Sequence, residues 1–431
     1  MTTMKNFKTN SILDSFSKYI VIFLPILLIF SRSVADATIV IIALLFLYKS
    51  FINKNWVWVK ESWFIFALIF WGYLLLINTP LSANPEKTLF YSIAFIRWPI
   101  FALALAYWIL NTQEQQKKFF NVFAIVFGFI VFDCWWQYFN YTDIFGYPKL
   151  FDGMRLTGPF RDNPIPGIWL SRLTFLFLLI ATLFNPIKKY SFSFISYFLI
   201  LFIGAFTVFI TGERMAFILT LCALFLVLFA LFVEKKSMRM NLIYFLFILT
   251  ISIIIFGYNN PEITNRTVIS TIDQFSKIEN MFTLSDHHNV MPDVGALAYT
   301  YGLVFQSAVK VWLESPILGV GLHTYREVCS DFGLMGTGPG VCWHPHNISL
   351  ELLSETGIIG FTLFYAMIIS IFVSIFKSFR ENGSFFILSI LSALLFLCFF
   401  PLSTGISIFN NGFAAIIWLI VGWLTIYQKH N

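Results

Sequence analysis

Apolar residues in this chain gather in long runs that are separated by short polar segments. Many runs approach ~17–25 residues, the length that an α-helix needs to cross the hydrocarbon core of a bilayer. The polar residues between Pro401 and Gly405 divide the last long run in two. We therefore expect about twelve transmembrane helices, at residues 18–33, 34–52, 62–78, 89–110, 119–140, 164–184, 190–210, 214–233, 241–258, 348–376, 384–401 and 407–427.

The first apolar run also has features of a secretory signal peptide. A basic segment precedes it, and Ala35-Asp36-Ala37 follows it with the small-x-small spacing of a cleavage site. We expect an uncleaved first helix instead, because a second apolar run begins immediately afterwards.

Composition and charge agree with a membrane protein. Of the 431 residues, 58% are hydrophobic and 12% are charged, and the mean hydropathy is +0.79. Lysines cluster in the segments between alternate runs, so both termini are predicted to be cytoplasmic by the positive-inside rule. The net charge of +6 therefore reflects topology. No nucleic-acid partner is expected, since the basic residues never form a stripe.

The predicted fold class is an all-α polytopic membrane protein with one large outer loop. Within that loop, Ala296 to Glu314 is predicted to form an amphipathic helix, because Leu297, Val304 and Val311 share one face. We expect this helix to lie on the membrane surface. The chain is divided into residues 1–258 with helices 1–9, residues 259–346 as the large outer loop, and residues 347–431 with helices 10–12.

Two of the five cysteines lie in the outer loop. Cys329 and Cys342 flank a glycine-rich segment, and outside the membrane, in an oxidising compartment, they are candidates for a disulfide. Free thiols are the alternative. A zinc site is less favoured, because no Cys-x-x-Cys is present. The other three cysteines lie within predicted helices, where packing is their expected role.

A histidine-rich segment precedes the tenth predicted helix. His346 lies next to Asn347, which is a plausible N-cap, and the positive end of the helix dipole favours a neutral imidazole. A neutral imidazole can accept a proton from a hydroxyl, so His346 suits a general base. The alternative is a histidine that only caps the helix. His344 is equally close to the helix start, and Glu351 and Glu355 share one helix face beyond it.

Arginines are concentrated outside the cytoplasmic segments. Arg214 lies in a tight turn between two predicted helices, where its guanidinium would be held at the membrane surface and could bind a lipid phosphate. Pairing with Glu213 at a helix start is the alternative. Arg97 and Arg172 lie inside helices, where ionisable groups are usually functional, but an ion pair with Asp133 or Glu351 would also explain them. For the outer arginines as a group, interfacial snorkelling is the alternative to ligand binding.

The arrangement His346-Asn347, nine residues, Gly357, two residues, Gly360 resembles the signature of the O-antigen ligase family. This family groups with O-antigen polymerases and some bacterial protein O-oligosaccharyltransferases. The resemblance covers roughly residues 130–375. It also includes Asp133 with Gln137, Gly158-Pro-Phe-Arg161, Thr211-Gly-Glu-Arg214 and Pro316-Ile-Leu-Gly-Val-Gly321.

The resemblance implies a metal-independent membrane glycosyltransferase of the bacterial inner membrane, with a periplasmic active site and no cofactor. Its donor would be a glycan on undecaprenyl pyrophosphate, and its acceptor a sugar hydroxyl of lipid A–core. By position, His346 would be the base. Spacing to Gly357 favours it over His344, which could instead contact substrate. The arginines expected to bind pyrophosphate are Arg214 and Arg161, with Arg155, Arg172 and Arg266 as possible helpers.

Two other functions stay open at the level of sequence. The first is a polymerase or protein O-oligosaccharyltransferase of the same superfamily, which would handle the donor in the same way and differ in the acceptor. The second is a transporter or flippase. A transporter is less favoured, because it should show internal repeats and polar groups at mid-membrane depth, whereas polar residues here gather in loops on one side.

Overall fold

A computed structural model describes residues 11–151, 153–184, 192–272, 296–332, 342–403 and 405–430. Within these ranges the chain is nearly all helical and contains no strand, apart from isolated bridges in the loop after residue 141. The first half contains α1 (Ser11–Ile22), α2 (Leu24–Phe30), α3 (Arg32–Ile52), η1 (Val57–Lys60), α4 (Ser62–Tyr73), η2 (Leu74–Asn78), α5 (Pro85–Phe95), α6 (Arg97–Ala104), η3 (Leu105–Ile109), α7 (Gln113–Asn140), η4 (Gly158–Phe160) and α8 (Pro166–Phe184).

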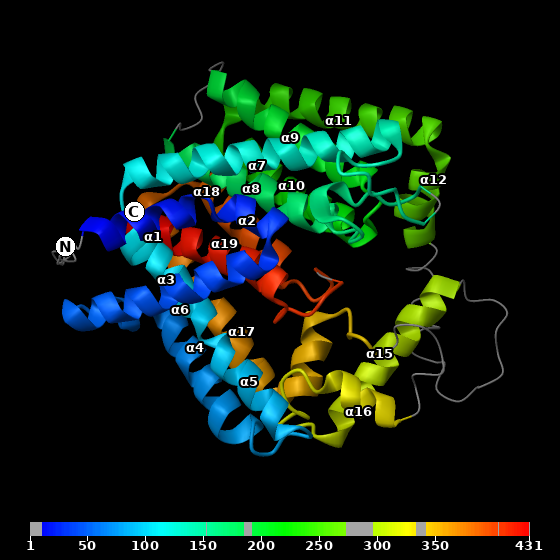
Figure 1. Ribbon diagram of the computed structural model, residues 1–431. Helices are drawn as coiled ribbons and strands as arrows, with labels where there is room; N and C mark the ends of the chain where they lie inside the picture. Colours follow the sequence, from blue (N-terminus) through cyan, green and yellow to red (C-terminus); the bar gives the residue numbers. More distant parts are fainter. Residues whose placement is uncertain are drawn as a thin grey trace.

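The second half begins with two further long apolar helices that are joined by a tight turn. It contains α9 (Phe192–Ile210), α10 (Arg214–Glu234), η5 (Lys236–Met238), α11 (Arg239–Asn259), α12 (Pro261–Thr264), η6 (Asn265–Ile269), α15 (Ala296–Glu314), α16 (Tyr325–Asp331), α17 (Ile348–Asn382), α18 (Phe385–Phe399) and α19 (Asn411–His430). In Figure 1, α12, α15 and α16 lie on the side of the bundle opposite to α1 and the end of α19.

Helices long and apolar enough to cross a membrane number eight in the described part of the chain, or nine if α1 and α2 form one bent span. Three shorter apolar helices, Ser62–Asn78, Ile195–Ile210 and Phe385–Phe399, lie within other predicted spans. These findings establish a polytopic membrane protein, whereas the expected count of twelve transmembrane helices remains a prediction.

The first predicted span differs from expectation. Instead of one helix at residues 18–33, α1 and α2 meet at a bend of 50°. Pro25 lies in the first turn of α2, where the absence of its N–H costs no hydrogen bond. Because proline has no N–H, it cannot continue the backbone hydrogen bonding of α1. The next helix, α3, already begins at Arg32.

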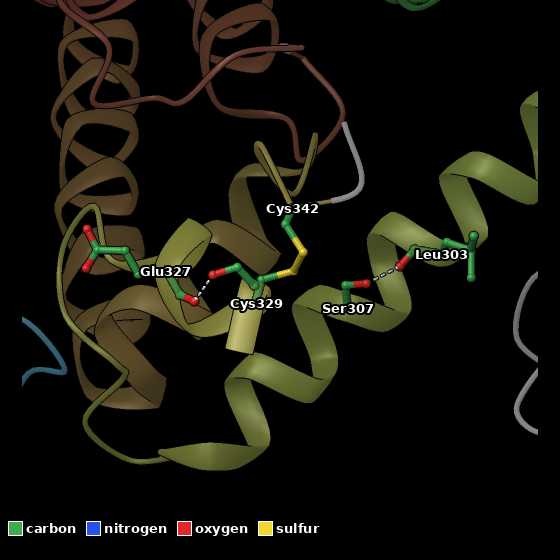
Figure 2. Close-up of a disulfide and its surroundings, with 6 residues drawn as sticks. Leu303, Ser307, Glu327, Cys329 and Cys342 are labelled. Carbon is green, nitrogen blue, oxygen red and sulfur yellow. Dashed lines mark hydrogen bonds between the residues drawn. A yellow bond between two sulfur atoms is a disulfide. The ribbon is translucent and has the colours of Figure 1, made fainter. Parts of the chain in front are cut away.

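The helix predicted in the outer loop is α15, with the expected bounds. Its apolar residues Val304, Ala308 and Val311 are buried, and Ala308 and Val311 pack in a small cluster with Tyr325 and the Cys329–Cys342 disulfide. Figure 2 shows this disulfide beside α15. The described part of this face is therefore covered by protein and is not available to a membrane surface. The glycine-rich segment between the two cysteines lies outside the described residues.

The long helix α17 is broken at Gly357, where φ is +62°. The turn at residues 316–321 packs against this break. Ile358 N–H donates to the Pro316 carbonyl at 2.9 Å, and Gly321 N–H donates to the Glu355 carbonyl at 2.9 Å. A Cβ at Gly357 would collide with the Ile317 carbonyl. Glycine is required here for both its backbone conformation and the close approach of the turn.

Candidate active site

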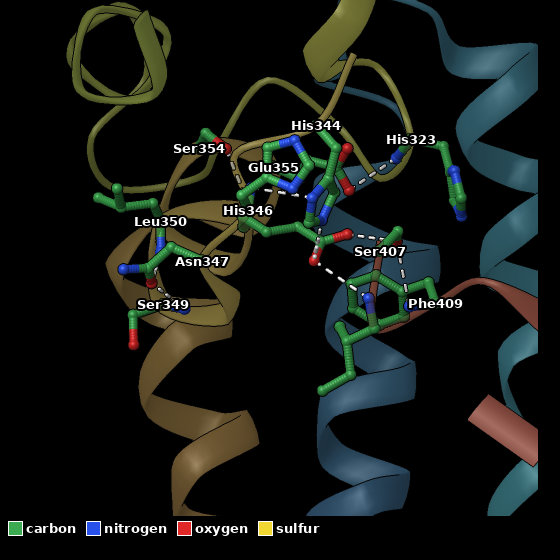
Figure 3. Close-up of polar contacts among 12 residues, drawn as sticks. His323, His344, His346, Asn347, Ser349, Leu350, Ser354, Glu355, Ser407 and Phe409 are labelled. Atoms are coloured by element: carbon green, nitrogen blue, oxygen red, sulfur yellow. Dashed lines mark hydrogen bonds and ion pairs between the residues drawn. The ribbon is translucent and has the colours of Figure 1, made fainter. Parts of the chain in front are cut away.

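The centre of the site is a buried histidine–carboxylate pair at the start of α17. His344 Nε2 lies 3.0 Å from Glu351 Oε2. His346 N–H donates to His344 Nδ1 at 2.8 Å. Since Nδ1 accepts a hydrogen bond, the proton of a neutral His344 belongs on Nε2, which then donates to Glu351. Figure 3 shows the two histidine rings beside each other.

Glu351 is held from a second side by the loop before α19. It accepts hydrogen bonds from the Ser407 hydroxyl and from Ile408 N–H, the latter at 3.1 Å. The carboxylate therefore receives three hydrogen bonds in an interior position, 1% exposed. Two of these come from residues more than 50 positions away in the sequence, so the site is assembled by tertiary packing.

His346 is half-buried and adopts a left-handed backbone conformation, with φ of 51°. Burial, followed by the neighbouring His344, lowers the pKa of His346 to about 4, and a hydrogen bond that the imidazole donates to the backbone of Gly405 opposes this shift. The imidazole is therefore neutral at physiological pH. A Cβ at Gly405 would lie 3.7 Å from His346 Nδ1, so the backbone of Gly405, whose carbonyl accepts this bond, lies beside that nitrogen. A carbonyl only accepts, which favours the tautomer with the proton on Nδ1 and the lone pair on Nε2.

Asn347 is the N-cap of α17, as its sequence position predicts. Its side-chain oxygen accepts hydrogen bonds from Ser349 N–H at 2.9 Å and from Leu350 N–H at 3.2 Å. These bonds satisfy amides that the helix itself leaves without partners. The cap fixes where the helix begins and so holds His344 and His346 immediately before it.

A third histidine, His323, completes this end of the site. Its backbone N–H donates to Glu355 Oε2 at 2.9 Å, and its ring stacks on the Tyr91 ring with centroids 3.7 Å apart. Burial lowers the pKa of His323 to about 4. The His323 ring points away from the other two histidines in Figure 3. No sequence pattern predicts a role for His323, and the turn that ends at Gly321 is the signal near it.

Arginines form a second centre around the turn between α9 and α10. Arg266 Nε donates to the Gly212 carbonyl at 3.1 Å, and Arg155 lies 3.8 Å from Glu213. Both guanidinium groups also approach the Phe151 ring, at 5.8 Å for Arg155 and 5.2 Å for Arg266. Arg214 begins α10 in the same turn. We call Arg155, Arg214 and Arg266 the arginine cluster.

Gly212 allows the arginine cluster to assemble. It has φ of +70°, and a Cβ there would collide with the Met154 carbonyl. The loop that contains Met154 and Arg155 is also joined to the α9–α10 turn by a hydrogen bond from Leu156 N–H to the Thr211 carbonyl at 3.2 Å. The turn and the loop thus touch through their backbones, which brings Arg155 beside a turn more than 50 residues later.

Glu213 does not cap α10, the helix that it precedes. It accepts hydrogen bonds from Gly167 N–H at 2.6 Å and Ile168 N–H at 3.3 Å, which lie in the first turn of α8. Burial raises the pKa of Glu213 to about 7, although Arg155 opposes the shift. At neutral pH this carboxyl therefore only partly neutralises Arg155, and the cluster keeps an excess of positive charge.

Comparison with known protein families gives a match to the O-antigen ligase family model over residues 199–365. These residues, which make up less than half of the chain, are similar to the O-antigen ligase family. No curated protein matches the chain. This similarity indicates a membrane-integral enzyme of the glycosyltransferase type, acting in general on lipid-linked glycans and acceptors of the lipid A–core type. The matched region contains Arg214, Arg266 and the three histidines of the site.

Two of the arginines predicted from the ligase resemblance lie outside the cluster. Arg172 is 1% exposed in α8, where its guanidinium donates to the Ile168 carbonyl at 2.6 Å and the Ser403 carbonyl at 2.8 Å. These contacts join α8 to the loop before α19. Arg161 is exposed at the surface with φ of 62°. Arg172 is thus held in the interior by main-chain carbonyls, while Arg161 lies at the surface.

The ion pairs with Asp133 or Glu351 that were considered for Arg97 and Arg172 are wrong. Arg97 pairs with Asp36 at 3.1 Å and donates to Asn411 at 2.8 Å. Arg172 binds carbonyls, as described above. Both side-chain partners of Arg97 are distant in sequence, so no local pattern could have identified them.

A continuous series of contacts connects the two centres of the candidate site. Glu213 binds the first turn of α8, and Arg172 in the same helix binds the Ser403 carbonyl. Two residues later, Gly405 lies against His346. The loop before α19 therefore touches α8 on one side and the histidines on the other, and so fixes the position of the arginine cluster relative to His346.

Proposed function

We propose that this protein is an O-antigen ligase that transfers a glycan from undecaprenyl pyrophosphate to a sugar hydroxyl of lipid A–core. The reaction would take place at the periplasmic face of the bacterial inner membrane, with both termini in the cytoplasm. The observation that carries the proposal is the neutral, half-buried His346, connected through α8 to a separate cluster of arginines. A base and an anion site are the two elements that this reaction requires.

In the proposed reaction, His346 Nε2 takes the proton of the acceptor hydroxyl. The hydroxyl oxygen forms a bond to the anomeric carbon of the donor glycan, and the bond between that carbon and the phosphate oxygen breaks. The bonding electrons leave with undecaprenyl pyrophosphate, which gains one negative charge. The imidazolium then returns its proton to the leaving group or to water. The pyrophosphate linkage supplies the driving force, so neither a nucleotide nor a cofactor is needed.

The arginine cluster would bind the pyrophosphate and stabilise the charge that develops on it. Guanidinium groups match phosphate oxygens with two parallel hydrogen bonds. Arg155 Nε is buried and lacks a hydrogen-bond partner among the residues that the structure describes, so a donor remains there for an anion. Arg161, exposed on the same loop, would contact the donor from outside. His344 and Glu351 would orient His346 through its backbone amide, although His344 remains a candidate for contact with the acceptor.

A pKa of about 4 in the free enzyme makes His346 a weak base, and binding of the donor would raise this pKa. The negative charge of pyrophosphate favours the imidazolium and so raises the pKa of a nearby histidine. The base would then strengthen when the donor is in place, which suits a transfer enzyme that must not activate hydroxyls alone.

The test is transfer by purified His346→Ala and Arg214→Ala variants, with Arg326→Ala as a control, because Arg326 is an exposed arginine outside the cluster. Removing a general base costs about 10²–10⁴-fold in rate, and removing one preorganised donor costs about 10²–10³-fold. Normal transfer by the His346 or the Arg214 variant would exclude its assigned role.

A deletion strain separates the proposed ligase from its relatives. Loss of polymer from the core, with lipid-linked polymer accumulating, is the result expected for a ligase. A core that carries one repeat unit would identify a polymerase. Unchanged lipopolysaccharide with under-glycosylated secreted proteins would identify a protein O-oligosaccharyltransferase.

A further inference from the structure

A cavity of about 580 Å³ lies between α3, the α5–α6 segment and the residues that precede α19. It does not include the arginine cluster or the His344–Glu351 pair. Its walls are mainly aliphatic and aromatic, while Asp36, Arg97, His323 and Asn411 form a polar group at its edge. We call this the α3–α6 cavity. Its size falls within the range of sites that bind small molecules or lipid chains.

The α3–α6 cavity is elongated along α3. Asp36, Val40, Leu44 and Leu47 line it at intervals of three or four residues, which places them on one helix face. At the α-helical rise this row is about 17 Å long. Leu44 and Phe90, on opposite walls, are 60% and 69% exposed, so the cavity opens on the apolar side surface of a membrane-spanning bundle. A hydrocarbon chain entering from the bilayer fits this shape.

The polar group at the edge of the cavity is well suited to hydroxyls. Asp36 and Asn411 both bind Arg97, and Asn411 also donates to Asp36 at 3.1 Å. Arg97 Nε and His323 Nε2 are buried and have no hydrogen-bond partner among the described residues. The group thus offers unused polar atoms, although the ion pair between Arg97 and Asp36 leaves it with no excess charge.

The polar group also adjoins the proposed active site. His323 N–H binds Glu355, one helical turn after Glu351 on α17. From the other side, Phe409 N–H donates to Ser407 Oγ at 3.1 Å, and this hydroxyl binds Glu351. A headgroup at His323 would therefore lie beside the residues that hold His344 and His346.

We propose that the α3–α6 cavity binds one hydrocarbon chain of the acceptor lipid, with sugar hydroxyls of that lipid at Asp36, Asn411 and His323. This inference rests on the proposed function. The acceptor is a better occupant than the donor for an electrostatic reason. A pyrophosphate requires uncompensated cations, and these lie in the arginine cluster, whereas Arg97 is already paired with Asp36.

The inference is tested by narrowing the cavity with Leu44→Trp. Ile41→Trp is the matched control, because Ile41 is also an exposed aliphatic residue of α3, 41% exposed, but does not line the cavity. Transfer is measured with lipid A–core and with the same core oligosaccharide released from its lipid. We expect Leu44→Trp to raise the KM for lipid A–core at least tenfold. The KM for the donor, and transfer to the released oligosaccharide, should stay within twofold of the unmodified protein.

Three results would overturn the inference: an unchanged KM for lipid A–core in Leu44→Trp, an equal rise in the Ile41→Trp control, or a rise in the KM for the donor. The last would place the polyprenyl chain of the donor in the cavity.

A second measurement does not depend on activity, and so separates failure of this inference from failure of the proposed function. The full-length protein is photolabelled in membranes with a glycolipid that carries a diazirine in its acyl chain, and with a diazirine-bearing polyprenyl pyrophosphate. Adducts of the glycolipid on residues 36–47 or 90–100, reduced in Leu44→Trp and retained in Ile41→Trp, support the site even if transfer to lipid A–core fails. Labelling of these segments by the polyprenyl probe alone, or by neither probe, would exclude it.

Discussion

Replacement of Glu351 by glutamine distinguishes the two histidines that could act as the base. In the proposed site, His346 takes the proton of the acceptor hydroxyl, and the His344–Glu351 pair only holds His346 in place. If His344 were the base, the negative charge of Glu351 would stabilise the imidazolium that forms during the reaction. The Glu351→Gln change removes this charge while keeping the size and shape of the side chain.

The hydrogen bonds around Glu351 allow this substitution. Oε2 accepts from His344 Nε2 and Ile408 N–H, and Oε1 accepts from the Ser407 hydroxyl. A glutamine can place its carbonyl oxygen at the Oε2 position and accept both bonds, since that oxygen has two lone pairs. Its NH₂ group then faces Ser407, whose hydroxyl can turn and accept. Alanine would instead strand three buried donors at ~1–3 kcal/mol each, and so destabilise the protein by at least about 3 kcal/mol.

The expected ranking of transfer rates follows from these roles. Glu351→Gln should retain activity within about tenfold, because the orientation of His344 is preserved. His346→Ala should lose about 10²–10⁴-fold, the usual contribution of a general base, equal to about 3–5 kcal/mol of transition-state stabilisation at 1.36 kcal/mol per tenfold. Initial rates are measured with purified protein at saturating donor. A loss in Glu351→Gln as large as that in His346→Ala, with thermal stability unchanged, would refute the assignment and make His344 the base.

Four further outcomes are expected. With a pKa of about 4, His346 stays in its base form until the pH falls through that value, so kcat/KM for the donor should decline only near pH 4. Because bound pyrophosphate raises the pKa of His346, kcat should begin to decline at a higher pH than kcat/KM does. A decline of both at the same pH would contradict this effect. Replacing both Cys329 and Cys342 by serine should destabilise the outer segment by about 3 kcal/mol for a loop of this length, observed as earlier proteolysis of the folded protein. Asn347→Ala removes the cap of α17 and should cost about 1 kcal/mol, measured by thermal unfolding against Asn347→Ser, which keeps a capping oxygen. Gly357→Ala places a Cβ against a carbonyl at a positive φ, so we expect loss of transfer with the protein still inserted in the membrane; full activity would show that the break in α17 is dispensable.

Much of the helical framework could be predicted from the hydrophobic pattern alone. Long apolar runs have no stable alternative to a helix in a bilayer, because every backbone amide must be satisfied within the segment. This explains why the membrane helices after α2 appear close to their expected bounds. The bend between α1 and α2 was missed because the run stays apolar through Pro25, and hydropathy carries no information about direction.

The active site could be predicted only where its contacts are local. Asn347 was recognisable as a cap because its partners lie two and three residues away. The bonds from Ser407 to Glu351 and from Arg172 to Ser403 join segments separated by 56 and 231 residues. Their identity depends on how the helices pack, and a single sequence does not contain that information. The sequence therefore indicates which arginines and histidines are candidates, and their roles stay predictions, but it does not indicate their partners.

The spacing between Asn347 and Gly357 acquires a physical meaning from the break in α17. These positions delimit a short helical segment, about 15 Å long at the α-helical rise, which begins at the cap and ends where the 316–321 turn inserts. Glu351 and Glu355 lie one turn apart on its inner face, the first bound to His344 and the second to the amide of His323. The segment thus connects the proposed base to the polar end of the α3–α6 cavity. Lengthening this segment by one residue would rotate one carboxylate by about 100° away from its partner. An insertion between Glu351 and Glu355 should therefore uncouple acceptor binding from catalysis. The affinity for the donor, which the arginine cluster would hold, should stay unchanged.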